Sequence, residues 1–137
     1  MIDDVIVNKL ATIDRCLQRI KDVYLEAGEH FSTDYTRQDS VILNLQRACE
    51  AAIDLANYIN KIKKLGIPQS SRDSFELLYK ARFISGDVSN NLKKMVGLRN
   101  IAVHDYKELN IDIVKFIVEN HLVDFQYFNK EIKLIAL

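Results

Sequence analysis

The chain of 137 residues has the length of one domain, residues 1–137, and can bury about two thirds of the surface that its unfolded chain exposes. One proline and four glycines are far fewer than average usage, so few chain breaks and long helices are expected. Nineteen basic and nineteen acidic residues give a formal net charge of zero, which argues against a nucleic-acid binder that works by bulk charge.

The first predicted helix starts near the N-terminus, where Asp3 and Asp4 suit its positive end, and stops at Gly28. The segment 30–36 is polar, with Asp34 and Thr36 as candidate N-caps of a second long helix that runs to about Leu65. Apolar residues recur at three- and four-residue steps along both helices, as on the buried face of an amphipathic helix. In the first helix these residues are Ile2, Ile6, Leu10, Ile13, Leu17, Ile20 and Tyr24, and in the second Val41, Leu45, Ala48, Ala52, Leu55, Ile59 and Ile62.

Ser70 and Ser71 can cap a shorter third helix that carries Phe75, Leu78, Tyr79 and Phe83. Gly86 interrupts the pattern, and Asp87 can start a fourth helix. Asn110 is expected to cap one last helix, whose apolar side holds Ile111, Val114, Ile117, His121, Phe125, Phe128, Ile132 and Ile135. No segment alternates with period two, so the sequence predicts an all-α, antiparallel bundle of four to five helices.

Cys16 and Cys49 lie among apolar helical residues, so we expect two small core residues and neither a disulfide framework nor a zinc site. The chain shows no basic-then-apolar leader and no apolar run of membrane-spanning length, which predicts a soluble, cytoplasmic protein without a membrane partner. No glycine-rich phosphate loop occurs, and His30 and His121 are isolated. We therefore expect neither a cofactor nor a bound metal.

Charge is unevenly distributed along the chain. Residues 61–107 contain ten Lys and Arg but four Asp and Glu, whereas the remainder contains nine basic and fifteen acidic residues. Each lysine taken singly can belong to a solvated helix face. The basic part also carries the motif described next, which favours a local surface that attracts phosphate.

Arg99, His104 and Tyr106 form an Arg-x4-His-x-Tyr string. A guanidinium can hold a phosphate through two hydrogen bonds and offset negative charge that grows on its oxygens. An imidazole, with an ordinary pKa of about 6.5, can take or give a proton at neutral pH. Together they suffice for attack of a ribose 2′-hydroxyl on the adjacent phosphate without a metal. The alternative is a structural Arg–His–Tyr network that closes the end of a helix.

On a regular helix, Arg99 and His104 would point about 140° apart, whereas Asn100 and His104 would share a face. Two arrangements could bring Arg99 and His104 to one phosphate. The helix distorts or ends between them, or two chains contribute residues to one site across a dimer interface. Gly97 allows another backbone to approach closely and so favours the dimer slightly.

The segment Gly97-Leu-Arg-Asn-Ile-Ala-Val-His-Asp-Tyr106 resembles, over its whole length, the signature of the HEPN ribonucleases of the HepT type. Residues 39–59 resemble the second helix of that family, and residues 68–75 resemble its connection from the second to the third helix. The resemblance covers residues 37–108, and its specific part is the ten-residue signature. The first and last helices agree with the family only in pattern.

This resemblance implies a HEPN-like fold and a metal-independent endoribonuclease, the toxin of a two-gene system, which cuts an RNA such as mRNA or tRNA. Carried over residue by residue, Arg99 and His104 are expected to be catalytic, and Asn100 to help position the substrate. The expected partner is a minimal nucleotidyltransferase (MNT) antitoxin that silences the toxin by adding AMP to Tyr106. A homodimer with the motif in an interfacial cleft is also implied.

The competing hypothesis is a non-catalytic helical module that binds a nucleotide or a protein. The intact set of Arg99, His104 and Tyr106 favours the enzyme, because a pure scaffold has no need of all three together. For Tyr106 itself, the alternative to an exposed modification site is a helix-end tyrosine packed against the last helix.

Overall fold

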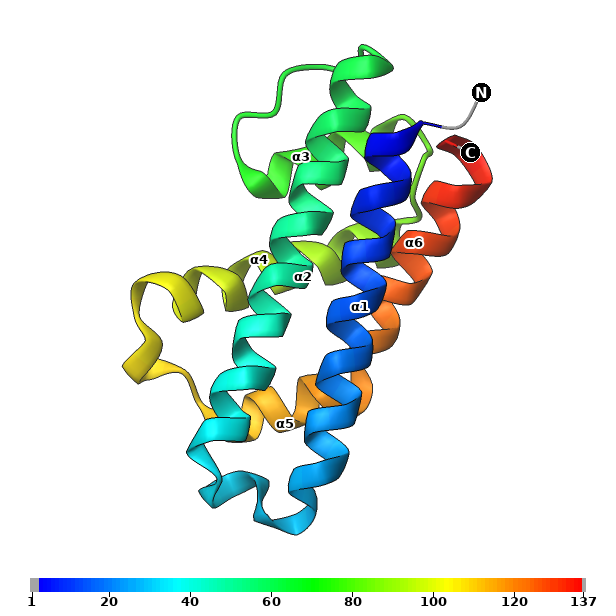
Figure 1. Ribbon diagram of the computed structural model, residues 1–137. Coiled ribbons are helices and arrows are strands. Elements are labelled where there is room, and N and C mark those ends of the chain that lie inside the picture. The colour runs from blue at the N-terminus through cyan, green and yellow to red at the C-terminus, as the bar shows by residue number, and fades with distance from the viewer. Residues whose placement is uncertain (1–2, 137) are drawn as a thin grey trace.

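The computed structural model describes residues 3–136, which form six α-helices and two short 3-10 helices (Figure 1). The α-helices are α1 (Asp4–Ala27), α2 (Tyr35–Ile62), α3 (Ser71–Lys80), α4 (Gly86–His104), α5 (Ile111–Asn120) and α6 (Leu122–Ala136), and the 3-10 helices are η1 (Gly28–Thr33) and η2 (Tyr106–Glu108). No strand occurs in these residues, and the prediction of an all-α fold is confirmed. Ile2, which was predicted on the apolar face of the first helix, lies outside the described residues, as does Leu137.

Helices α1 and α2 form a long hairpin with the most extensive helix–helix contact in the described chain (Figure 1). The Asp3 carboxylate caps α1 by accepting hydrogen bonds from two backbone N–H groups of the first turn, at 2.9 and 3.3 Å. Gly28, with φ of 55°, ends α1 as predicted. Of the two candidate caps of α2, Asp34 is the one used, since its carboxylate accepts from the backbone N–H of Arg37 at 3.1 Å.

Three predicted helix boundaries differ from the structure. Helix α2 ends at Ile62, before the predicted Leu65, because Lys64 adopts a left-handed φ of 56° and the N–H of Leu65 turns back to the Asn60 carbonyl at 2.9 Å. Ser70 caps α3 as predicted, but α3 ends at Lys80, so Phe83 lies beyond it. Helix α4 begins at Gly86 with Ser85 as its cap; Asp87 is therefore already inside the first turn.

The predicted last helix is two helices. Asn110 caps α5 as expected, but the chain breaks at His121, and α6 then runs alongside α1 while α5 lies across the bundle (Figure 1). His121 Nδ1 lies 2.9 Å from a carboxylate oxygen of Asp124, and the other oxygen of this buried carboxylate accepts from Asn91 of α4 at 3.3 Å. This polar contact with α4 anchors the break, which raises the helix count from the expected four or five to six.

The core fills the space between α1, α2, α4 and α6. Phe75 of α3 and Phe128 of α6, both buried, meet edge to face in this core, with ring centroids 5.8 Å apart. Cys16 and Cys49 are buried free thiols, as predicted. Within the described residues, no helix is both long and apolar enough to cross a membrane.

The two halves of α4 differ in burial, and this difference places the motif. The first half packs into the core through Val88, Leu92, Met95 and Val96, whereas beyond these residues only Ala102 is buried. The second half therefore extends away from the bundle, as the yellow part of the ribbon in Figure 1 shows.

Candidate active site

Arg99 and His104 both lie on α4, and the helix is continuous between them. It ends at His104, where the N–H of the next residue, Asp105, still donates to the Ile101 carbonyl at 2.8 Å. The arrangement in which the helix distorts or ends between Arg99 and His104 is therefore not the one adopted. The two side chains leave the helix about 140° apart, as its geometry requires. Of the two arrangements considered, the one in which two chains contribute residues to one site is left.

Arg99 is half-buried and points toward α2. Its Nη2 lies 3.7 Å from a carboxylate oxygen of Glu50, and its Nη1 donates to the side-chain oxygen of Asn100 at 3.2 Å. Its Nε is buried and has no hydrogen-bond acceptor among the residues that the structure describes. The guanidinium is thus held at one edge and retains donor capacity for an anion.

Glu50 is a neighbour of Arg99 that the sequence did not indicate. Gln46, one turn earlier on α2, donates to the other Glu50 carboxylate oxygen at 2.8 Å, so the carboxylate is oriented as well as charged. In the sequence, Glu50 looks like any acidic residue on a solvated helix face. Only the packing of α4 on α2 reveals its role beside Arg99.

Asn100 and His104 differ in what surrounds them. Asn100 is half-buried and its side-chain oxygen accepts from Arg99, so the structure brings these two neighbours together. His104 is exposed at the last residue of α4, where its imidazole is open to solvent and to a partner molecule. A histidine in this position can exchange protons with a substrate that approaches from outside.

Tyr106 lies in η2, two residues beyond His104, and 45% of it is exposed. Its hydroxyl donates a hydrogen bond to the Asp39 carboxylate near the start of α2. Burial of the ring, together with the hydrogen bond and the negative charge of Asp39, raises the pKa of Tyr106 to about 12. The alternative of a tyrosine packed against the last helix is wrong, because the partner belongs to α2.

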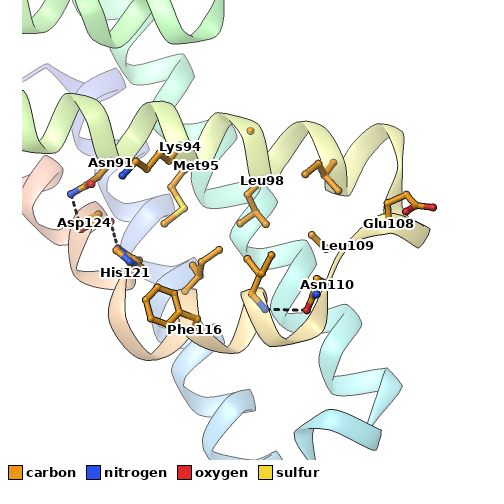
Figure 2. A pocket seen from close by; sticks show the side chains of 14 residues that line it. Asn91, Lys94, Met95, Leu98, Glu108, Leu109, Asn110, Phe116, His121 and Asp124 are labelled. Carbon is orange, nitrogen blue, oxygen red and sulfur yellow. Dashed lines mark hydrogen bonds and ion pairs between the residues drawn. The ribbon is translucent and has the colours of Figure 1, made fainter.

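An apolar groove of about 400 Å³ runs between α4 and α5, beside the motif (Figure 2). Its walls include Leu98 and Ile101 of α4 and Ile113 and Phe116 of α5, and the last three are at least two fifths exposed. The pair of His121 and Asp124 closes one end (Figure 2). The groove therefore offers exposed apolar surface next to the helix that carries Arg99 and His104.

Gly97 has a different neighbour from the one expected. A Cβ at this position would lie 3.1 Å from Nη2 of Arg72, whose side chain reaches across from α3 of the same chain. The close approach that Gly97 permits is thus made inside the chain, and it is not evidence for a dimer. Among residues 3–136, no three His, Cys, Asp or Glu side chains gather as they would to hold a metal ion.

An all-α bundle whose fourth helix carries a half-buried Arg99 and ends in an exposed His104, followed by a tyrosine, is typical of the HEPN class. A family model described as Ribonuclease HepT-like matches residues 13–132. The mRNA nuclease HepT of Shewanella oneidensis is 62% identical over 131 residues, which cover 96% of this chain and 98% of that protein. The chain therefore belongs to the HepT-like ribonuclease family.

Solved structures agree with this assignment. The tri-AMPylated HEPN toxin of S. oneidensis, in complex with its MNT antitoxin, matches with a TM-score of 0.92 and 60% identity, over 97% of this chain and 99% of that one. A toxin–antitoxin structure with AMP-PNP matches with a TM-score of 0.90 and 60% identity, over 96% and 99% of the two chains. YutE of Bacillus subtilis, at 17% identity and a TM-score of 0.73 over 90% and 87%, shows the fold alone. The predicted HepT-type ribonuclease toxin is confirmed; the roles of individual residues stay predictions.

Proposed function

We propose that this protein is a cytoplasmic, metal-independent endoribonuclease toxin that cuts mRNA or tRNA. One observation carries the proposal: the set of Arg99 and His104 on α4 and Tyr106 in the following η2 is intact in a chain 62% identical to an mRNA nuclease. These residue types supply a phosphate-binding cation and a proton-transfer group, which are the two requirements of cleavage by a ribose 2′-hydroxyl.

In the proposed reaction, His104 takes the proton of the 2′-hydroxyl as its oxygen attacks the adjacent phosphorus. The bond from phosphorus to the 5′-oxygen of the next nucleotide breaks, and that oxygen leaves as a hydroxyl after taking a proton from water. Arg99 offsets the charge that grows on the phosphate oxygens. The products are a 2′,3′-cyclic phosphate and a 5′-hydroxyl. Asn100, which accepts a hydrogen bond from Arg99, keeps the guanidinium oriented.

The active form is proposed to be a homodimer in which each site uses both chains. The continuous α4 directs Arg99 and His104 away from each other, so a second copy of the helix is needed to complete one site. Exposed apolar side chains along the groove between α4 and α5, notably Ile113 and Phe116, support a second chain packing beside the motif.

A complementation experiment tests the composite site. Arg99→Ala and His104→Ala chains are each expected to be inactive, whereas a mixture should regain activity because one of the two sites in each heterodimer keeps both groups. Random pairing makes half of the dimers heterodimers, so we expect about a quarter of the wild-type cleavage rate per dimer. RNA cleavage is measured after subunit exchange, with heterodimers counted by native mass spectrometry. Heterodimers without any rescue would confine the site to one chain.

Glu50 is proposed to position Arg99, so Glu50→Ala should lower kcat/KM for RNA by about tenfold, because a displaced guanidinium holds the phosphate less well. Glu76→Ala is the matched control. It breaks the half-buried ion pair between Glu76 of α3 and Lys93 of α4, which does not involve Arg99. Both changes should lower the free energy of unfolding by no more than about 1 kcal/mol. Equal cleavage by the two variants would contradict a positioning role.

The proposed regulator is an MNT nucleotidyltransferase antitoxin that transfers AMP to Tyr106. The S. oneidensis toxin is tri-AMPylated and in complex with an MNT antitoxin, which supports the same kind of partner for this chain. The exposure of Tyr106 and its place two residues beyond His104 support it as the acceptor.

A further inference from the structure

Three tyrosines of the described chain donate their hydroxyl hydrogen to a carboxylate. Tyr24 donates to Glu119 at 2.5 Å, Tyr58 donates to Asp3 at 2.7 Å, and Tyr106 donates to Asp39. The first pair ties α1 to α5, and the second ties α2 to the cap of α1. The third pair joins η2 to α2 directly beside the Arg-x4-His motif, so it is the one placed to take part in the chemistry of Tyr106.

The pair of Asp39 and Tyr106 lies in an open hollow of about 340 Å³. Ile42, Leu43 and Gln46 of α2 form the rest of its lining, so Asp39 is the only titratable group among the four residues that line the hollow with Tyr106. Asp39 is itself exposed, and nearly half of Tyr106 is exposed. A nucleotide held by another protein can therefore reach the phenolic oxygen while the carboxylate stays in contact with its hydrogen.

We propose that Asp39 is the proton acceptor in the transfer of AMP to Tyr106. The proposal rests on the proposed function, in which an antitoxin presents ATP to this tyrosine. The phenolic oxygen forms a bond to the α-phosphorus of ATP, the bond from that phosphorus to the oxygen bridging to the β-phosphate breaks, and pyrophosphate leaves. The phenolic proton passes to the Asp39 carboxylate and from there to solvent, which the exposure of Asp39 permits.

The state of the phenol explains why a proton acceptor is needed. Burial, followed by the hydrogen bond to Asp39 and its negative charge, raises the pKa of Tyr106 to about 12, so the phenol is protonated at neutral pH. A neutral phenol is a weak nucleophile, and it becomes strongly acidic only while the new oxygen–phosphorus bond forms. A carboxylate already hydrogen-bonded to it can take the proton at that moment.

The same contact is lost once AMP is attached. The tyrosine oxygen then has no hydrogen to donate, and the negative phosphodiester next to it repels the Asp39 carboxylate. The modified η2 segment therefore loses this hydrogen bond to α2. Asp39 thus promotes the transfer of AMP, and afterwards it repels the modified Tyr106 side chain from its position beside α2.

The test uses Asp39→Asn, because asparagine keeps an oxygen that accepts from the phenol but is not a base. Each full-length variant is incubated with the cognate nucleotidyltransferase, ATP and Mg²⁺, and loss of the unmodified chain is followed by intact mass spectrometry. We expect the initial rate to fall by about 100-fold in Asp39→Asn and equally in Asp39→Ala, and to be partly restored in Asp39→Glu. Asp3→Asn and Glu119→Gln alter the other two pairs and should leave the rate unchanged.

A pH series separates proton transfer from placement of the ring. Without a base at position 39, the Asp39→Asn chain has to react through its phenolate, whose fraction grows about tenfold per pH unit. The ratio of the wild-type rate to the Asp39→Asn rate should therefore shrink as pH rises from about 6.5 to 9.5. Taking the ratio cancels the pH dependence of the nucleotidyltransferase itself. Thermal unfolding of each variant shows that the fold is retained.

The outcomes distinguish the two proposals. A wild-type chain that never gains AMP overturns the proposed regulation and this inference with it. A wild-type chain that is modified, together with an Asp39→Asn chain modified equally fast, overturns the inference alone. A constant rate ratio across the pH series would show that Asp39 only places the ring of Tyr106. An Asp39→Ala rate far below that of Asp39→Asn would show the same. Either result overturns the inference.

Discussion

His104→Ala is expected to lower the rate of RNA cleavage by about 10²- to 10⁴-fold, the range that general acid–base catalysis contributes. His104 is exposed at the end of α4, so its removal leaves the core intact and should change the free energy of unfolding by no more than about 0.5 kcal/mol. Cleavage is measured on a labelled RNA, with the chemistry of the new ends determined. The wild-type ends should be a 2′,3′-cyclic phosphate and a 5′-hydroxyl, formed equally well in EDTA.

His30→Ala is the matched control, because His30 is also exposed but lies in η1, outside the motif. The His30→Ala variant should cleave RNA at the wild-type rate. Full activity of His104→Ala, or loss of wild-type activity in EDTA, would disprove the mechanism. A folded wild-type chain that cleaves no RNA would favour the competing hypothesis of a non-catalytic helical module.

Tyr106→Phe should abolish AMP transfer, because the variant keeps the ring but has no oxygen to form the new bond. The variant should also keep cleaving RNA after incubation with the cognate nucleotidyltransferase and ATP, whereas the wild type is silenced. AMP on Tyr106 adds a negative charge and a bulky base two residues from His104, so repulsion of the RNA phosphate and steric blockage act in the same direction. Intact mass and residual cleavage are measured on the same samples.

Tyr24→Phe and Tyr58→Phe serve as controls, since both tyrosines also donate to carboxylates but lie in or beside the helical bundle. Both variants should be modified and silenced like the wild type. If Tyr106→Phe gains AMP, the acceptor is another residue, and the proposed role of Tyr106 fails.

The helical class and the ends marked by a cap or a glycine could be predicted from the sequence. Gly28, Asp34, Ser70 and Asn110 act within one turn of their own position, where a left-handed φ or a side-chain oxygen satisfies free backbone groups. Such effects are local, so they can be predicted from sequence. The Arg-x4-His-x-Tyr string was recognisable for the same reason, since its three residues lie in one short segment.

The residues that surround this string could not be predicted from the sequence. Glu50 lies beside Arg99 and Asp39 beside Tyr106 although 49 and 67 residues separate them in sequence, because the end of α4 and η2 pack along one side of α2. The break at His121 has no glycine or proline to mark it and depends on the buried contact of Asp124 with Asn91. Apolar periodicity tells which face of a helix is buried, but not which polar residue of another helix that face will meet. The partners of the motif are therefore set by helix packing.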